Sequence, residues 1–216
     1  MKLAFDPGKV TVSIHPTFLS IHAISKLTRG SSVVIGSQDA FYEDSGAYTG
    51  EISPEHLHPL GCAYVLIGHS ERRRYSGETD AIVNKKAHAV LNERMIPVVC
   101  VGETSEEREG GNKDHIVRRQ VERGLQGISL VGTQKLIVAY EPVWAIGTGK
   151  AATPSAVKYM HQVIYHTLLD IFPKSAVSHN AFVIYGGSVD KTNIADFLKE
   201  DVVDGVLVGG AGLKFD

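Results

Sequence analysis

Short apolar segments alternate with helix-like stretches along this chain, and this order limits the folds that it can adopt. Seven segments are brief, rich in β-branched or aromatic residues and mostly without polar alternation, which is typical of strands buried on both faces of a parallel sheet. They are Val10–His15, Ser32–Gly36, Tyr64–Ile67, Ile96–Val101, Leu136–Tyr140, Phe182–Tyr185 and Gly205–Val208. We therefore expect an α/β fold in which strand and helix follow each other along the chain.

Apolar residues recur at helical spacing between these strands. The clearest helices are expected over Thr79–Arg94, His115–Leu125 and Pro154–Phe172, and shorter ones over Thr17–Leu27, Pro54–Leu60 and Ile194–Lys199. Thr153 is expected to cap the helix that starts at Pro154, because proline suits a first helical turn. No linker-like break interrupts the 216 residues, so we expect a single domain over residues 1–216.

The composition excludes several classes of function. The formal charge is -2 at pH 7 and 21% of the residues are charged, so no basic stripe for nucleic acid is expected. No apolar run of membrane-spanning length and no signal-like start is seen, which favours a cytoplasmic protein without a membrane partner. Cys62 and Cys100 are too few for a disulfide framework, and the ten histidines contain no paired-ligand motif. We expect neither a metal nor another cofactor.

Nearly every predicted strand opens into polar or glycine-rich sequence at its carboxyl end. GHSERR follows Ile67, GETSEERE follows Val101, EPVWAIGTG follows Tyr140, GGSV follows Tyr185 and GGAG follows Val208. In parallel α/β folds the loops at these ends form the functional face. Five loops are thus predicted to lie together on this functional face.

Residues 139–149, AYEPVWAIGTG, have the composition of a catalytic loop. Glu141 directly follows an apolar strand, which places a carboxylate on a rigid element at the rim of the sheet. A proline then fixes the exit direction, and two glycines free the segment to close as a lid. The only tryptophan of the chain lies here, and so large a side chain is seldom left on an idle loop. The predicted lid residues are Pro142, Val143 and Trp144.

Two glycine-rich loops predict a phosphate site. Gly186, Gly187 and Ser188 form one of them, and Gly209 with Gly210 forms the other. Barrel folds commonly hold phosphate on the loops after their last two strands, where unpaired backbone N–H groups point outward and glycine lets the backbone approach the anion. A single glycine pair would equally fit a turn, but two at successive strand ends favour phosphate.

His69 completes the predicted constellation. It lies just past a strand, in what reads as the first turn of a helix, and a helix amino terminus disfavours the imidazolium form. A neutral histidine can donate a hydrogen bond to a carbonyl group. Together with a carboxylate base and a phosphate cradle, it describes proton transfer next to the carbonyl of a small phosphorylated sugar. The sequence therefore predicts an isomerase, with His69 and Glu141 as catalytic residues.

The motifs GHSERR, VVCVGET, AYEPVWAIGTGK, YGGSV and LVGGAGL, with SGAYTGEIS at 45–53, closely resemble the triosephosphate isomerase family, in order and along almost the whole chain. The resemblance implies a (β/α)8 barrel, here with seven recognisable strands. It implies interconversion of dihydroxyacetone phosphate and D-glyceraldehyde 3-phosphate in glycolysis and gluconeogenesis. A glutamate base, a neutral histidine electrophile and a closing loop are the established mechanism of that family, so the roles that the resemblance implies are not new.

The resemblance also implies roles that the residues alone do not indicate. Gly147, Ser188, Gly209 and Gly210 correspond to phosphate ligands, and Tyr185 and Ala152 to the pair that latches the closed lid. Glu71 corresponds to a buried acid beside a catalytic lysine; without that lysine it should take up a proton or recruit water. The segment 45–53 corresponds to a protruding loop that docks Thr49 into a second copy, which implies a homodimer.

The chain departs from the family pattern at both ends. In the family the first strand supplies a catalytic lysine, whereas Val10–His15 matches the second strand; Lys2 and Lys9 do not lie where a substitute would have to be. The family's first strand and helix and its last helix have no counterpart here. We expect an incomplete version of a longer sequence, with severely reduced turnover, unpaired strand edges and a weakened dimer if 216 residues are the whole polypeptide.

Two other functions remain open. A non-catalytic protein that binds phosphosugars would share the glycine loops, but it has no need of a base and a neutral histidine. Another phosphate-binding barrel enzyme, such as one of tryptophan or histidine synthesis, would not account for AYEPVWAIGTG. Cys100 is expected to be a small core residue, and Arg72, Arg73 and Arg74 are expected to pair with nearby acids.

Overall fold

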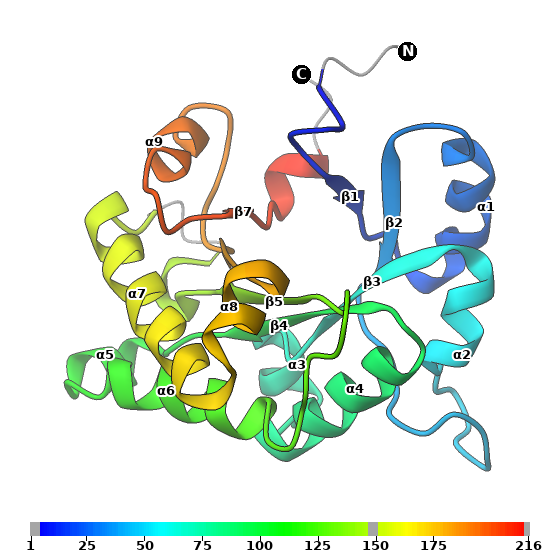
Figure 1. Ribbon diagram of the computed structural model, residues 1–216, viewed down its shortest axis with the longest axis horizontal. Helices are drawn as coiled ribbons and strands as arrows, with labels where there is room; N and C mark the ends of the chain where they lie inside the picture. Colours follow the sequence, from blue (N-terminus) through cyan, green and yellow to red (C-terminus); the bar gives the residue numbers. More distant parts are fainter. Residues whose placement is uncertain (1–4, 147–150, 214–216) are drawn as a thin grey trace. The chain divides into compact units, whose positions relative to one another are not determined.

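The computed structural model describes residues 5–146 and 151–213. Its strands are β1 Val12–Ile14, β2 Val33–Ser37, β3 Cys62–Ile67, β4 Ile96–Val101, β5 Leu136–Tyr140, β6 Ala181–Tyr185 and β7 Gly205–Val206 (Figure 1). Its α-helices are α1 Phe18–Thr28, α2 Pro54–Leu57, α3 Ser70–Tyr75, α4 Asp80–Asn92, α5 Ser105–Glu109, α6 Lys113–Gly124, α7 Pro154–Ile171, α8 Lys174–Asn180 and α9 Ile194–Leu198. Short 3-10 helices are η1 His58–Leu60, η2 Val143–Ala145 and η3 Gly210–Leu213. The predicted alternation of strand and helix is confirmed.

The chain divides into two compact units. The first comprises residues 1–67 and 85–97, and the second comprises residues 68–84 and 98–216. Helix α4 and strand β4 have residues in both units. The single domain expected over residues 1–216 stays a prediction.

The first unit contains a parallel sheet in the order β1, β2, β3. Val12 pairs with Val33, and Gly36 pairs with Tyr64 after a register shift at Ile35 and Gly36. A glycine suits position 36, because an added Cβ would overlap the ring of His15 and lie 2.8 Å from the backbone oxygen of Tyr64. The buried apolar side chains of this unit include Ile21, Ile35, Leu57, Val65, Ile67 and Val90.

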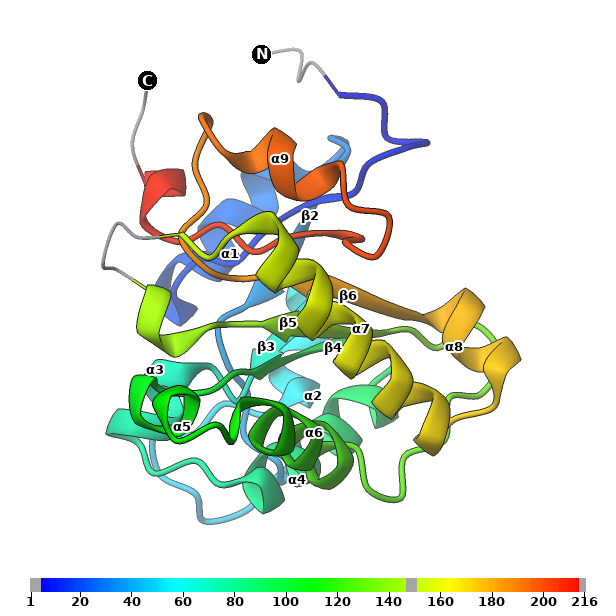
Figure 2. The same ribbon diagram turned by 90° about the vertical axis from the view of Figure 1, so that its left-hand side faces the viewer.

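The second unit carries β4, β5, β6 and β7 as neighbouring parallel strands. Tyr140 pairs with Val101 on one side and with Tyr185 on the other, so the carboxyl ends of three strands are level. Helix α7 packs against α6 and contacts both β5 and β6 (Figure 2). The fully buried side chains of this unit include Leu136, Tyr140, Met160, Ile164, Leu168, Tyr185 and Phe197.

The predicted helix starts agree well with the structure where the sequence supplies a cap. Thr153 Oγ1 accepts the N–H of Ala156 at 3.3 Å, and Pro154 occupies the first helical turn, as expected. Helix α8 was not predicted: it follows Pro173 without a capping side chain and is short and largely polar. The predictions for Val10–His15 and Gly205–Val208 were too long, since pairing covers only Val12–Ile14 and Gly205–Val206.

Three further properties belong to the described residues. None of their helices combines the length and apolarity that crossing a bilayer requires. Within the same ranges, no three side chains of His, Cys, Asp or Glu lie together as metal ligands would. Cys62 and Cys100 are free and buried, and burial raises the pKa of Cys62 to about 11, so it stays a thiol at neutral pH. The prediction that Cys100 is a core residue is confirmed.

Candidate active site

Backbone hydrogen bonds hold the strand ends of the second unit together beyond the strands themselves. The N–H of Glu141 donates to Val101 O at 2.7 Å, that of Gly186 to Tyr140 O at 2.8 Å and that of Leu207 to Tyr185 O at 2.8 Å. The loops after β4, β5 and β6 therefore begin side by side. Strand β5 places Glu141 between the other two loops.

Two glycines make room for Glu141. An added Cβ at Gly102 would overlap the Glu141 carbonyl oxygen, and one at Gly186 would lie 3.0 Å from Glu141 Cγ. The Gln120 side chain fixes Gly102: its Oε1 accepts the Gly102 N–H at 2.7 Å, and its Nε2 donates to Gly102 O at 3.2 Å. Sequence reasoning missed Gly102 and Gln120 as site residues. The available signal was a glycine directly after a strand.

His69 caps the amino end of α3, close to the helix start that the sequence predicts. Its Nδ1 accepts the backbone N–H of Glu71 at 3.3 Å. Since an accepting Nδ1 carries no hydrogen, the neutral ring carries its hydrogen on Nε2. His69 Nε2 lies 3.2 Å from Glu141 Oε1. The structure thus brings together the two side chains that the sequence assigns to the same functional face, at the carboxyl ends of the strands.

Glu141 is a buried carboxylate with few donors. Its exposed fraction is 1%, and Oε2 accepts the backbone N–H of Ser70 at 3.2 Å. Oε1 has no hydrogen-bond partner within the described residues, because the approach of His69 Nε2 has the distance but not the geometry of a hydrogen bond. Burial raises the pKa of Glu141; His69, the Ser70 N–H, the Cys100 thiol and the Arg73 charge oppose this rise.

The base of the predicted lid is tied to a second buried acid, Glu103. Trp144 Nε1 donates to Glu103 Oε1 at 2.9 Å, and Tyr140 OH lies 3.1 Å from both carboxylate oxygens. Arg108 Nη1 donates to Glu103 at 3.2 Å, and its guanidinium lies 4.5 Å from the centre of the Trp144 ring. Glu103 was not singled out from the sequence, although it lies two residues past a predicted strand, as a site residue would. The lone tryptophan is accounted for by this contact.

The residues of the predicted latch are in contact. Tyr185 OH accepts the N–H of Ala152 at 3.2 Å. Ser188 Oγ donates to Ala145 O at 2.7 Å, so its hydroxyl is engaged with the segment that follows Trp144. Gly147, a further predicted phosphate ligand, lies outside the described residues.

The predicted phosphate glycines Gly209 and Gly210 border open space. Apart from the adjacent residues in the chain, no heavy atom of the described residues lies within 4 Å of the position that a Cβ would take at either glycine. Gly210 begins the short helix η3, so unpaired backbone N–H groups occur there. The phosphate role of Ser188, Gly209 and Gly210 stays a prediction.

The remaining predicted site residues have simpler surroundings. The Glu71 side chain is 70% exposed and its Oε2 lies 3.9 Å from His69 Nδ1, so the burial on which its expected protonation depends is not observed. Pro142 is buried, and Val143 begins η2. Thr49 is exposed on a loop of the first unit. Their functional roles stay predictions.

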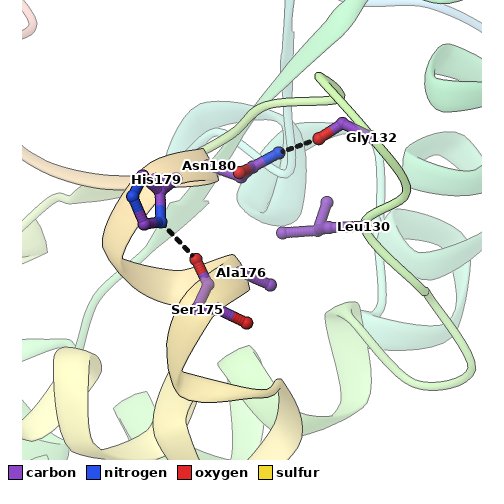
Figure 3. A pocket seen from close by; sticks show the side chains of 6 residues that line it. All are labelled: Leu130, Gly132, Ser175, Ala176, His179 and Asn180. Atoms are coloured by element: carbon purple, nitrogen blue, oxygen red, sulfur yellow. Dashed lines mark hydrogen bonds between the residues drawn. The ribbon is translucent and has the colours of Figure 1, made fainter.

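A hollow of about 340 Å³ lies at the other ends of the strands (Figure 3). Its lining residues are Leu130, Gly132, Ser175, Ala176, His179 and Asn180. Asn180 Nδ2 donates to Gly132 O at 2.9 Å, and His179 Nδ1 lies 2.8 Å from Ser175 O. These polar groups already have partners within the fold. Since it borders the amino ends of β5 and β6, this hollow is separate from the site around Glu141.

Known proteins resemble this chain over nearly all of its length. The family model described as triosephosphate isomerase matches residues 2–216. The triosephosphate isomerase of Moorella thermoacetica is 48% identical over 206 residues, which covers 95% of this chain and 82% of the relative. That of Dictyoglomus thermophilum is 44% identical over 203 residues, with 94% and 81% covered. That of a Roseiflexus species is 43% identical over 211 residues, with 98% and 83% covered.

These matches agree with the order of strands and helices and with the parallel pairing of every described strand pair. The predicted resemblance and the predicted α/β fold class are therefore confirmed. The chain belongs to the triosephosphate isomerase family and has its α/β-barrel fold class.

Proposed function

We propose that this chain is an isomerase that interconverts dihydroxyacetone phosphate and D-glyceraldehyde 3-phosphate, a step of glycolysis and gluconeogenesis. Membership of the family and the names of the relatives support this activity. The residue roles below are our assignments from the site's geometry. The observation that carries them is the approach of His69 Nε2 to within 3.2 Å of Glu141 Oε1, in a site closed from most solvent.

Glu141 is the proposed base. It takes a proton from the carbon next to the substrate carbonyl and returns one to the neighbouring carbon. Its raised pKa makes the ionised form a stronger base than an exposed carboxylate. To reach a substrate the side chain exchanges its hydrogen bond to the Ser70 N–H for contact with the reacting carbon. Losing that hydrogen bond to an ionised carboxylate costs about 2 kcal/mol, a small part of a catalytic barrier.

His69 is the proposed electrophile. Its Nε2–H donates to the substrate carbonyl oxygen and stabilises the charge that develops when the carbon loses its proton. The Glu71 N–H holds Nδ1 in the accepting state, so the ring keeps its hydrogen on Nε2. The same ring can then move protons between the two oxygens of the enediolate.

Ser188 and the backbone of Gly209 and Gly210 are the proposed phosphate ligands, with Gly147 as a further one. The open space next to Gly209 and Gly210 supports this assignment, since an anion can approach the backbone there without a Cβ in its way. Ser188 would release Ala145 O to bind phosphate. Replacing Gly210 by valine should raise KM for the triose phosphate about tenfold and leave the fold intact.

The test is an isomerase assay on the purified chain, coupled to a dehydrogenase that consumes the product. We expect turnover that Glu141→Gln abolishes. Glu122→Gln is the matched control, because Glu122 is a half-exposed acid of the same unit whose contact is Arg118. Turnover equal in both variants would exclude Glu141 as the base. A chain that binds triose phosphate but shows no turnover would instead be a phosphosugar-binding protein.

We further propose that two copies associate through the loop that carries Thr49. Phe41 N–H donates to Ile52 O at 2.8 Å and closes the loop, and the Phe41 ring stacks on Tyr42 and contacts Tyr48. The loop thus has its own small apolar base and presents Thr49 to solvent. Analytical ultracentrifugation of the wild type and of Thr49→Arg tests this: a dimer in the first and a monomer in the second are expected. We also propose a cytoplasmic location, which the two free thiols support and cell fractionation can test.

A further inference from the structure

Arg73 is the one of three successive arginines that faces the active site. Arg72 pairs with Glu78, and the guanidinium of Arg74 lies 5.1 Å from the centre of the Tyr75 ring on the exposed side of α3. The Arg73 side chain is only 19% exposed. The expectation that these arginines pair with nearby acids holds for Arg72 and Arg73, but Arg73 does more than make an ion pair.

The Arg73 guanidinium uses all three nitrogens at once. Nε donates to Gly68 O at 2.8 Å, Nη1 donates to Asp80 Oδ1 at 2.6 Å and Nη2 donates to Cys100 O at 3.3 Å. A planar guanidinium is suited to this arrangement, because its donors keep fixed directions. Lysine could satisfy only one or two of these acceptors in the same geometry.

Both carbonyl groups belong to peptides that neighbour the catalytic residues. Gly68 immediately precedes His69, and its positive φ of 69° sets the direction in which the chain enters the cap of α3. Cys100 immediately precedes Val101, whose own carbonyl receives the Glu141 N–H. Arg73 therefore links the backbone that carries His69 to the strand end on which Glu141 is anchored.

The charge of Arg73 also bears on Glu141. The groups that oppose the rise in its pKa are His69 and Ser70 at the start of α3, Cys100 on β4, and Arg73. Of these, Arg73 is the permanently charged cation. Asp80, which is 14% exposed, balances part of that charge and also lies 3.5 Å from Arg119 Nε.

We propose that Arg73 is a positioning residue for the reaction: its three-way hydrogen bonding fixes the backbone that carries His69 relative to the strand end on which Glu141 is anchored. This inference rests on the proposed isomerase function. It assigns Arg73 no contact with substrate.

The test compares Arg73→Met, Arg73→Lys and the control Arg74→Met, which removes an equal charge one residue away. Glutamate labelled with ¹³C at the carboxyl carbon gives the pKa of Glu141 by NMR titration of the free protein, with Glu141→Gln to assign the signal. ¹⁵N-labelled histidine reports the tautomer and surroundings of His69. The coupled assay gives kcat, KM and their pH dependence.

We expect Arg73→Met to raise the pKa of Glu141, because a stabilising positive charge is lost. The acid limb of the kcat/KM profile then moves to higher pH, since the base must be ionised to act. We expect kcat to fall about a hundredfold with little change in KM, as misplacement of a catalytic group does. Arg73→Lys should keep the pKa of Glu141 close to the wild-type value, because the positive charge is retained. It should recover only part of kcat, because lysine lacks the planar set of donors that arginine has.

Several results would overturn the inference. One is a Glu141 titration in Arg73→Met that matches the wild type, and another is a loss of kcat no larger than that of Arg74→Met. If Arg73→Met does not fold, Arg73→Lys decides: unchanged His69 signals and unchanged kcat would exclude the positioning role. The NMR titrations need no turnover, so a chain without isomerase activity would refute the proposed function and still leave Arg73 testable.

Discussion

Two buried carboxylates at neighbouring strand ends of the second unit have opposite surroundings. Glu103, after β4, is 0% exposed and Glu141, after β5, is 1% exposed. Glu103 is surrounded by the Tyr140 hydroxyl, the Trp144 indole N–H and the Arg108 guanidinium. Glu141 accepts one backbone N–H, and its Oε1 has no hydrogen-bond partner within the described residues.

Burial alone therefore does not make a carboxylate reactive. A carboxylate whose oxygens are saturated by donors is stabilised as a structural anchor, and Glu103 anchors Trp144 at the base of the predicted lid. A carboxylate that is buried with too few donors keeps a raised pKa and is free to exchange partners. Glu141 has these properties, which suit a base that has to move toward its substrate.

The largest effect on activity is expected when Glu141 is replaced. Glu141→Gln should lower kcat about a thousandfold, within the range for loss of a general base. Glu103→Gln should lower kcat less than about tenfold and act mainly on stability, because it weakens an anchor. The coupled assay and thermal unfolding of both variants distinguish the two roles. Equal losses of kcat would show that the two acids are not functionally different.

The next effect comes from the backbone next to Glu141. Gly102→Ala introduces a Cβ where the Glu141 carbonyl oxygen already lies, so we expect a loss of about 3 kcal/mol in the free energy of unfolding. Gly124→Ala, at the end of α6, is the control. A Cβ there would have ordinary contacts, at 3.6 Å from Val83 Cγ1, and should be neutral or stabilising. Urea unfolding of both variants measures the contrast; a Gly102→Ala protein as stable as the wild type would contradict it.

A smaller effect on stability is expected when the hydrogen bond between Trp144 and Glu103 is removed. Trp144→Phe removes the indole donor to Glu103 but keeps most of the apolar area, so we expect a loss of about 1 kcal/mol in the free energy of unfolding. The remaining donors, Tyr140 and Arg108, keep Glu103 satisfied. Double-mutant analysis with Glu103→Gln should give a coupling energy between the two residues; additive effects would argue against the anchor.

The smallest effect concerns the pH dependence of stability. The pKa of Glu141 is raised above its usual 4.5 in the folded protein, so its stabilising contribution is complete below pH 4.5 and is lost as the pH rises through the folded value. Glutamine cannot ionise, so Glu141→Gln avoids the loss of stability that ionising a buried carboxyl group causes. The variant should therefore gain stability relative to the wild type at pH 7 and not at pH 4, as measured by urea unfolding at both values. A gain independent of pH would mean that ionisation is not its cause.

Much of the fold could be predicted because it depends on local pattern. Continuous apolar runs gave the seven strands, and Thr153 with Pro154 gave the start of the longest helix. The errors lie where the local signal is weak. Helix α8 has no capping residue, and the ends of β1 and β7 depend on how far a neighbouring strand reaches, which no single segment encodes.

The candidate site divides in the same way. His69 and Glu141 could be found from the sequence, because each stands directly at a strand or helix boundary where function gathers in parallel α/β folds. Gln120 could not, since its importance lies in a contact with Gly102 that is distant along the chain. For Glu103 the sequence offered only its place two residues past a strand, because its contact with Trp144 is equally distant. The exposure of Glu71 was likewise beyond sequence reasoning.

The chemical groups of the protein and the order of the elements that present them can be read from the sequence, because hydrophobic period and turn chemistry are local properties. Three further properties require the folded structure: which carboxylate is satisfied and which is short of donors, which ring nitrogen of His69 holds the hydrogen, and which of three adjacent arginines hydrogen-bonds to the backbone of the site. These are consequences of the distances between atoms from separate elements, and the strength of a hydrogen bond or a charge interaction depends on those distances and on burial.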